Sequence, residues 1–144
     1  MATIKSFTSL EQSKVLAKIL PIESADSHYV RKVTDFRGNP VDGKWSEPRY
    51  GNTNSEYAHY VVQNFSSYEK LPAWSLSALL DYMHKVDLFP DITDFNGEFK
   101  LVVSYVNEEE EKILGNVQTI ISRNENLIDG CVEMIELLHE QKLL

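Results

Sequence analysis

The spacing of apolar residues predicts three helices, and the first covers residues 9–20. Four apolar side chains fall on one side of this helix: Val15, Leu16, Ile19 and Leu20. Its start has the spacing of a capping box, in which two residues three positions apart bond each other's backbone. Two pairs fit, Thr8 with Glu11 and Ser9 with Gln12. Pro21 then ends the helix, because proline does not continue one.

The two later helices follow the same pattern. One begins after Ser75, whose hydroxyl group is suited to cap it, and ends before Pro90. Its apolar positions are Leu76, Leu79, Leu80 and Met83. The last helix starts near Asn126 and ends at about residue 141. Five apolar side chains share one side of it, which is typical of a helix that covers a core: Ile128, Cys131, Val132, Ile135 and Leu138.

Segments rich in β-branched and aromatic residues predict the strands. They occupy residues 28–36, 57–65 and 98–106, and the serine and proline residues between 66 and 72 are expected to end the second. Asn96-Gly97 separates the third from residues 92–95, which predicts a hairpin with a two-residue turn. A further strand is expected at residues 112–121, with a bulge at Gly115.

Residues 37–56 contain glycine and proline at short intervals, which predicts an extended loop or the tip of one hairpin made by residues 28–65. No linker or repeat divides the chain, so residues 1–144 are expected to form a single domain. Strands interleaved unevenly with helices favour an α+β fold. We expect three helices packed on an antiparallel sheet of four to five strands.

Composition and cysteine content indicate where such a domain works. With 144 residues, 42% of them apolar, the chain is long enough to fold without disulfides. The one cysteine, Cys131, lies in an apolar helical pattern, and we expect it to be buried and chemically inert. The N-terminus has no signal-peptide pattern, and no segment is apolar enough to span a bilayer. We therefore expect a cytoplasmic protein with no membrane partner.

The net charge of −8 is distributed unevenly. Residues 1–72 contain 9 Lys+Arg and 8 Asp+Glu, whereas residues 73–144 contain 5 and 14, which gives +1 and −9. Because a negative surface repels phosphate, nucleic-acid binding through the second half is disfavoured, and a basic protein partner is favoured. The candidate interaction surface consists of Glu108, Glu109, Glu110, Glu111, Glu133, Glu136, Leu137 and Glu140. Leu137, an apolar residue among glutamates, is either a homodimer contact or an isolated surface residue.

Two other function classes remain open. The first is a small enzyme, with Asp26, His28 and His59 as acid and base between the strands at 28–36 and 57–65. The second is a nucleic-acid binder that uses cations and aromatic rings of the first half, namely Arg31, Lys32, Arg37, Lys44, Arg49, Trp45 and Tyr50. The histidines lack the spacing of metal ligands, and no P-loop, GxGxxG or GxSxG motif occurs. No metal or cofactor is predicted.

Three stretches of the chain carry a resemblance to known proteins: residues 7–14 together with 19–26, residues 72–80, and residues 129–144. They resemble a family of small uncharacterised proteins encoded in prophages and other mobile elements of Bacteroides-group gut bacteria. Gly130, where such relatives have alanine, and the polar connection at 37–56 depart from the family pattern. The resemblance implies a cytoplasmic, accessory role without an assigned activity. We therefore expect a non-catalytic accessory protein of a phage or mobile element that binds another protein.

Overall fold

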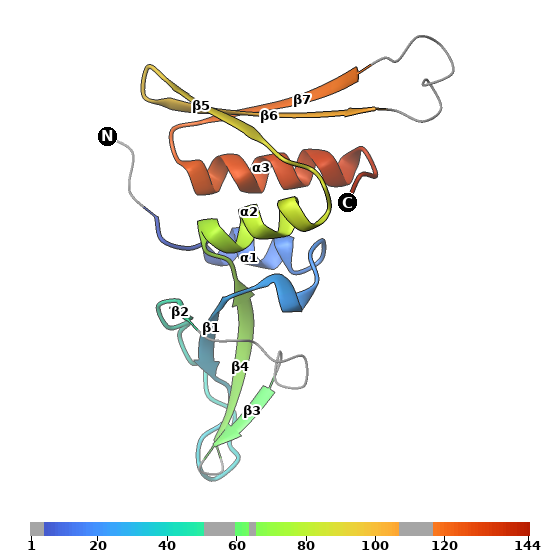
Figure 1. Cartoon of the computed structure of the whole chain (residues 1–144). Coiled ribbons are helices and arrows are strands. Elements are labelled where there is room, and N and C mark those ends of the chain that lie inside the picture. Colours follow the sequence, from blue (N-terminus) through green and yellow to red (C-terminus); the bar gives the residue numbers. More distant parts are fainter. Residues whose placement is uncertain (1–4, 51–59, 64–65, 107–116) are drawn as a thin grey trace. The chain divides into compact units, whose positions relative to one another are not determined.

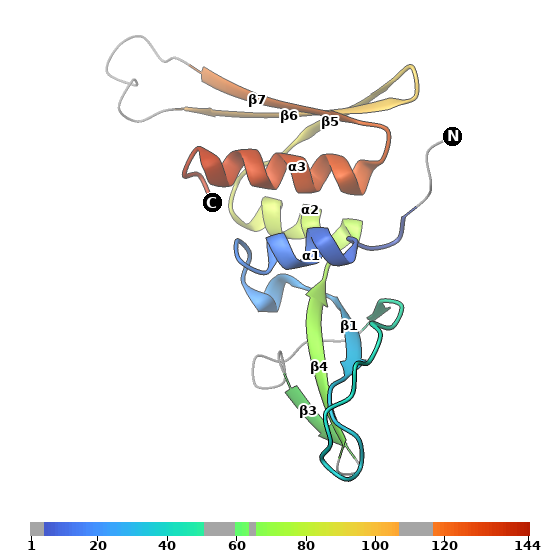
Figure 2. The ribbon, with the colours of Figure 1, turned by 180° about the vertical axis from the view of Figure 1, so that it is seen from behind.

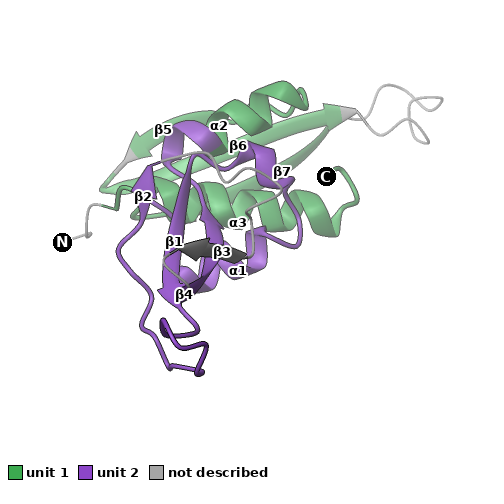
Figure 3. Cartoon of the chain, turned by 90° about the horizontal axis from the view of Figure 1, so that it is seen from below, with its two compact units in different colours: residues 1–6, 79–144 green, residues 7–78 purple. Residues whose placement is uncertain are grey.

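The computed structural model describes residues 5–50, 60–63, 66–106 and 117–144. They fall into two compact units, shown in different colours in Figure 3. Unit 1 comprises residues 1–6 and 79–144, and unit 2 comprises residues 7–78. Each contains helix and antiparallel strand, so the predicted α+β class is confirmed.

The sheet of unit 2 has the strand order β2-β1-β4-β3, with every neighbouring pair antiparallel (Figure 1). Its strands are β1 (Ser27–Lys32), β2 (Arg49–Tyr50), β3 (Tyr60–Gln63) and β4 (Ser66–Ala73). Residues 28–36 and 57–65 were expected to pair in one hairpin. This pairing is wrong, because β4 lies between β1 and β3 and pairs with both.

Strand β4 occupies residues 66–73, where the serine and proline residues were expected only to end the preceding strand. Its serines lie opposite β3, and Pro72 lies opposite His28 of β1. The pairing with β3 covers only Ser66 to Glu69. Pro72 therefore sits where β4 has one neighbouring strand among the described residues, and a missing N–H is tolerated at such an edge position.

The first helix of unit 2, α1 (Leu10–Leu16), begins with the second of the two predicted capping boxes. The Gln12 backbone N–H donates to the Ser9 hydroxyl at 3.2 Å, and the Ser9 backbone N–H donates to the side-chain oxygen of Gln12 at 3.0 Å. The helix ends four residues earlier than predicted, with Ala17 as its C-cap. Leu16 and Leu20 are buried, as expected for the predicted apolar side of the helix. Val15 was predicted to lie on that side as well, but it is 41% exposed. A short 3₁₀ turn, η1 (Ile22–Ser24), follows.

Trp74 and Thr8 form the centre of the core of unit 2, where both are fully buried. The Thr8 N–H donates to the Trp74 carbonyl at 2.9 Å, and the Trp74 N–H donates to the Thr8 hydroxyl at 3.1 Å. The indole N–H of Trp74 donates to the Ser24 hydroxyl at 2.9 Å. Tyr29 donates its hydroxyl proton to the Thr8 carbonyl at 2.6 Å. These bonds satisfy polar groups that would otherwise be costly to bury.

Unit 1 contains the second sheet, in the order β5-β6-β7. Its strands are β5 (Asp91–Phe95), β6 (Glu98–Val106) and β7 (Val117–Asn124). The predicted Asn96-Gly97 turn joins β5 to β6. Both turn residues have the positive φ that the turn requires, 53° and 80°. The single sheet of four to five strands that we expected is not confirmed. The strands belong to two sheets, and α2 (Leu76–Lys85) lies between β4 of the first and β5 of the second along the chain.

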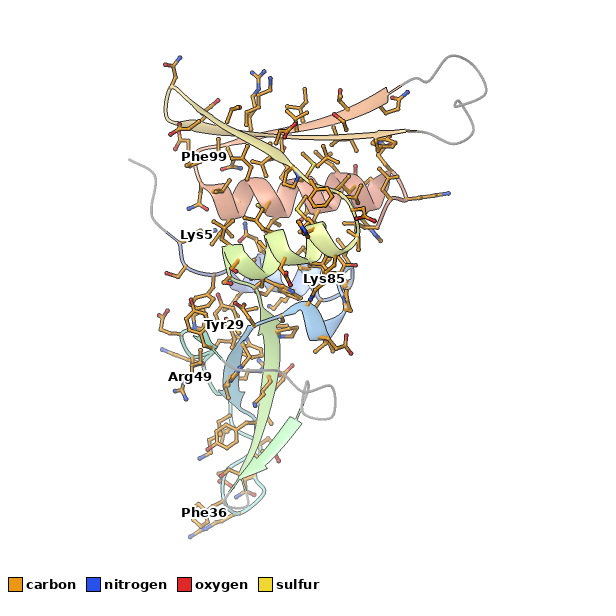
Figure 4. All side chains as sticks on the ribbon, viewed as in Figure 1. Lys5, Tyr29, Phe36, Arg49, Lys85 and Phe99 are labelled. Atoms are coloured by element: carbon orange, nitrogen blue, oxygen red, sulfur yellow. The ribbon has the colours of Figure 1, made fainter. Side chains whose placement is uncertain are left out.

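Helix α3 (Leu127–Glu140) covers one face of the unit 1 sheet (Figures 1 and 2). Asn126 caps it as predicted, accepting from the N–H groups of Ile128 and Asp129. The helix approaches the sheet closely at Gly130, where an added Cβ would lie 2.9 Å from the Leu101 side chain. Phe99 of β6 lies, like Leu101, on the face of the sheet that α3 covers (Figure 4). None of the described helices has the length and apolar character needed to cross a membrane.

Candidate functional site

The predicted acidic surface is only partly visible in the described residues. Glu108, Glu109, Glu110 and Glu111 lie outside them, so their role stays a prediction. On α3, Glu133 and Glu140 are exposed, while Glu136 and Leu137 are half-buried. Near the start of α3, Asp129 forms an ion pair of 2.6 Å with Lys5. The acidic side of α3 is therefore accessible to a partner over most of its length.

The structure describes two of the three residues of the alternative enzyme site, Asp26 and His28. Asp26 accepts hydrogen bonds from the Ser75 N–H at 2.9 Å, from the Ser75 hydroxyl and from the Ser27 hydroxyl at 3.2 Å. Ser75 in turn caps α2, since the Ala78 N–H donates to its hydroxyl at 3.2 Å. Asp26 thus anchors the start of α2. His28 is half-buried on β1, and His59 lies outside the described residues, so its proposed role is untested.

Part of the basic and aromatic set in unit 2 is already engaged. Arg31 contacts the Glu69 carboxylate at 2.5 Å and lies over the Trp45 ring, 4.9 Å from its centroid. Neither Arg31 nor the covered face of Trp45 is therefore open to a nucleic acid. Lys32 is half-buried. The other residues of this set are exposed: Arg37, Lys44, Arg49 and Tyr50. Figure 4 labels Arg49 among them.

Possible metal ligands and the Cys131 thiol are two further kinds of reactive group. Within the described residues, no group of three or more His, Cys, Asp and Glu side chains is placed to hold a metal ion. Cys131 is fully buried, and desolvation raises its pKa to about 12. Its thiol therefore stays protonated at neutral pH and has little nucleophilic character.

The most distinctive accessible feature lies in unit 1, at the edge of the sheet formed by β7. Two sheets have four edges, and natural edges are blunted by short length, charge, proline or bulges. In unit 2 the edge strands have only two and four residues, and in unit 1 the β5 edge carries Asp91 and Asp94. By contrast, β7 has eight residues, no proline, and an uninterrupted register with β6.

The hairpin determines which backbone groups of β7 face outward. Residues that flank a two-residue turn form a hydrogen-bonded pair, here Phe95 and Glu98. Even-numbered residues of β6 therefore bond to β5, and odd-numbered ones such as Leu101 bond to β7. The partner of Leu101 in β7 is Ser122, so the even-numbered residues of β7 face β6. The N–H and C=O groups of Thr119, Ile121 and Arg123 consequently point outward, and we call them the open edge of β7.

The side chains of the open edge lie on the face of the sheet opposite α3. Leu101 and Val103 point toward α3 and are buried, whereas Thr119, Ile121 and Arg123 are exposed. Ile121 is 46% exposed. Along the open edge, an apolar side chain therefore lies between a hydroxyl group and a guanidinium group.

A shallow hollow of about 560 Å³ lies on the sheet near its turn. Its lining includes three residues that lie side by side across the three strands: Thr93, Lys100 and Arg123. Asp94 and Glu98 complete the lining. The described residues nevertheless include no ion-pair partner within 4.0 Å of either Lys100 or Arg123. Two unneutralised cations thus neighbour each other directly across β6 and β7.

Helix α3 packs against β7. Gly130 faces the sheet close to Ser122 and Asn124 of β7, and the Ser122 hydroxyl donates to the Gly130 carbonyl at 2.9 Å. Glu133 follows Gly130 by three residues and is exposed, so it is the glutamate of α3 whose direction from the helix is nearest to that of Gly130. This helix lies on the face of the sheet opposite the Arg123 side chain.

Comparison of the chain with protein family models, with curated proteins and with solved structures found no match. The resemblance to prophage proteins thus stays a prediction. Sequence reasoning did not single out Thr119, Ile121 and Arg123. The predicted strand at 112–121 ended before Arg123, and only the pairing of strands in space determines which strand lies at an edge.

Proposed function

We propose that the protein is a non-catalytic accessory protein, in the mobile-element context that the resemblance implies, and that it binds an extended segment of another protein along β7. The observation that carries this proposal is the open edge of β7. No described strand lies beyond β7 in the strand order, so the outward N–H and C=O groups of this edge provide a template for one more strand. Main-chain hydrogen bonds would supply affinity, and neighbouring side chains would supply specificity.

The charge of unit 1 supports a basic partner. Unit 1 contains 6 Lys+Arg and 14 Asp+Glu, whereas unit 2 contains 8 of each. The resulting charge of −8 attracts cationic segments and accelerates their association. Glu133, Glu136 and Glu140 place part of this charge on α3, the helix that packs against β7. A second copy of the chain would carry the same charge to the same edge and is disfavoured.

The proposal is tested with a synthetic peptide of alternating lysine and valine, titrated into isotope-labelled protein while amide chemical shifts are measured. We expect the largest shifts at Thr119, Ile121 and Arg123. The substitution Ile121→Pro removes one outward N–H group without removing a bond to β6, as proline is tolerated at a sheet edge. We expect it to weaken peptide binding by about tenfold or more, because neighbouring bonds are also displaced.

The matched control is Ile92→Pro on β5. By the same alternation, Ile92 directs its N–H away from β6, and it is similarly exposed, at 38%. This variant should bind the peptide as the unmodified protein does. Equal binding by all three proteins, with both variants shown to be folded by their amide spectra, would contradict the proposal.

A further inference from the structure

We infer that β7 binds a partner strand whose side chains alternate between two chemical types. On the α3 face of the sheet, the partner's side chains are basic. On the outer face, an acidic side chain lies beside Arg123, and the next one, beside Ile121, is apolar. This inference rests on the proposed function, because it names the class of segment that the open edge of β7 accepts. It follows from the two unlike environments on the two faces of the sheet.

The position beside Arg123 favours an anion. Lys100 and Arg123 form a pair that exchanges no backbone bonds, and the side chains of such pairs approach closely. Like charges directly opposite each other destabilise a sheet. The carboxylates in the same hollow, Asp94 and Glu98, belong to the β5–β6 hairpin, and neither forms an ion pair with these cations. An added strand would extend the row from Lys100 and Arg123 by one position, where a carboxylate would pair with Arg123 and reduce the repulsion between the two cations.

The next outer position favours an apolar side chain. Ile121 lies opposite Val102 of β6, and its own exposed surface faces the place where the added strand would lie. A β-branched residue there would remove apolar surface from water and form a favourable cross-strand pair. The following outer position adjoins Thr119 and Ser104, which suits a hydroxyl side chain.

The inner face of the added strand would meet a different environment. Its side chains would lie on the α3 side of the sheet, and α3, which packs against β7, carries the exposed Glu133. Lysine or arginine at these alternate positions would complement that charge while keeping the long side chain partly solvated.

Antiparallel addition then fixes the order of residues in the partner. Read from its N-terminus, the segment passes Arg123, then Ile121, then Thr119. The peptide Lys-Asp-Lys-Ile-Lys-Thr-Lys satisfies every position. A second peptide with lysine in place of its aspartate carries more positive charge but lacks the carboxylate beside Arg123.

The experiment measures the affinities of both peptides for the unmodified protein and for the variants Arg123→Glu and Ile121→Pro. We expect the unmodified protein to prefer the aspartate peptide by about 5-fold, as charged cross-strand pairs differ by up to about 1 kcal/mol. Arg123→Glu should reverse this preference. Arg123 is exposed and its side chain forms no bond recorded within the described residues, so the variant is expected to fold.

The possible results separate this inference from the proposed function. If both peptides bind at the open edge of β7 but the preference is the same for the unmodified protein and for Arg123→Glu, the inference is wrong and the proposed function stands. If neither peptide binds, or Ile121→Pro has no effect, both are wrong. Sedimentation of the protein without peptide tests its oligomeric state. A dimer that is abolished by Ile121→Pro would show that a second copy of the chain pairs with β7, and it would overturn the inference.

Discussion

At the scale of single residues, the surroundings of Cys131 show how packing determines chemistry. The side chain is fully buried in the core of unit 1, with Ile128 and Ile135 of the same helix also buried. A thiolate in such surroundings would lose its hydration without gaining a partner, which is why the pKa of Cys131 rises to about 12. The sequence allowed this residue to be predicted, since its place in a helical apolar pattern already indicates burial.

The raised pKa of Cys131 predicts a loss of stability at alkaline pH. Above pH 9 the thiol ionises in the unfolded chain but not in the folded one, so the unfolded state is favoured as pH rises. Between pH 8 and pH 10 this coupling should lower the free energy of unfolding by about 1.5 kcal/mol. Urea unfolding at both pH values measures the effect. Cys131→Ala serves as the reference, and an equally large decrease in that variant would refute the assignment.

At the scale of elements, short local signals were predictable and pairings between distant strands were not. The Ser9 capping box, the Asn126 cap and the Asn96-Gly97 turn each depend on a few consecutive residues, and all three are present. Strand β4 was missed because its serines and Pro72 disfavour a strand locally, whereas pairing with β1 from residue 68 to 73 and with β3 from residue 66 to 69 overrides that preference. The same limit hid the open edge of β7, since an edge is defined by the absence of a neighbour.

The β5–β6 turn gives a prediction at this scale. Gly97 has φ of +80°, a conformation that costs a residue with a side chain about 1 kcal/mol. Gly97→Ala should therefore lower the free energy of unfolding by about 1 kcal/mol, although an added Cβ would contact nothing within 4 Å. Asn96→Gly, at the neighbouring position with φ of +53°, should change stability by much less. Thermal or chemical denaturation of both variants checks this, and equal losses would show that backbone strain is not the cause.

At the scale of the whole molecule, the uneven distribution of charge along the sequence coincides with the division into two units. The division into two units sharpens it, because unit 2 is neutral and the net charge of −8 belongs to unit 1. The same charge that attracts a basic segment is screened by salt over about 10 Å at an ionic strength of 0.1 M. Electrostatic and backbone contributions to binding can therefore be separated by ionic strength.

Binding of the lysine-valine peptide should weaken several-fold when salt is raised from about 0.05 M to about 0.5 M. A peptide with threonine in place of every lysine keeps the backbone bonds but lacks the charges, and its weaker affinity should barely change. Amide chemical-shift titrations at both salt concentrations provide the comparison. A threonine peptide as salt-sensitive as the lysine peptide would indicate that the charge of unit 1 does not take part.

The position of the boundary between the units within α2 has a consequence for how this protein can change over generations. The helix starts at Leu76, and the boundary falls between Ala78 and Leu79, so hydrogen bonds from one turn to the next cross it. No linker exists there at which recombination could detach one unit or fuse another in its place. A gene break at that point would leave each fragment with an incomplete helix. Separating the neutral unit from the acidic one at this point would therefore disrupt α2, and we expect new binding properties to arise by substitution on their surfaces rather than by exchange of modules.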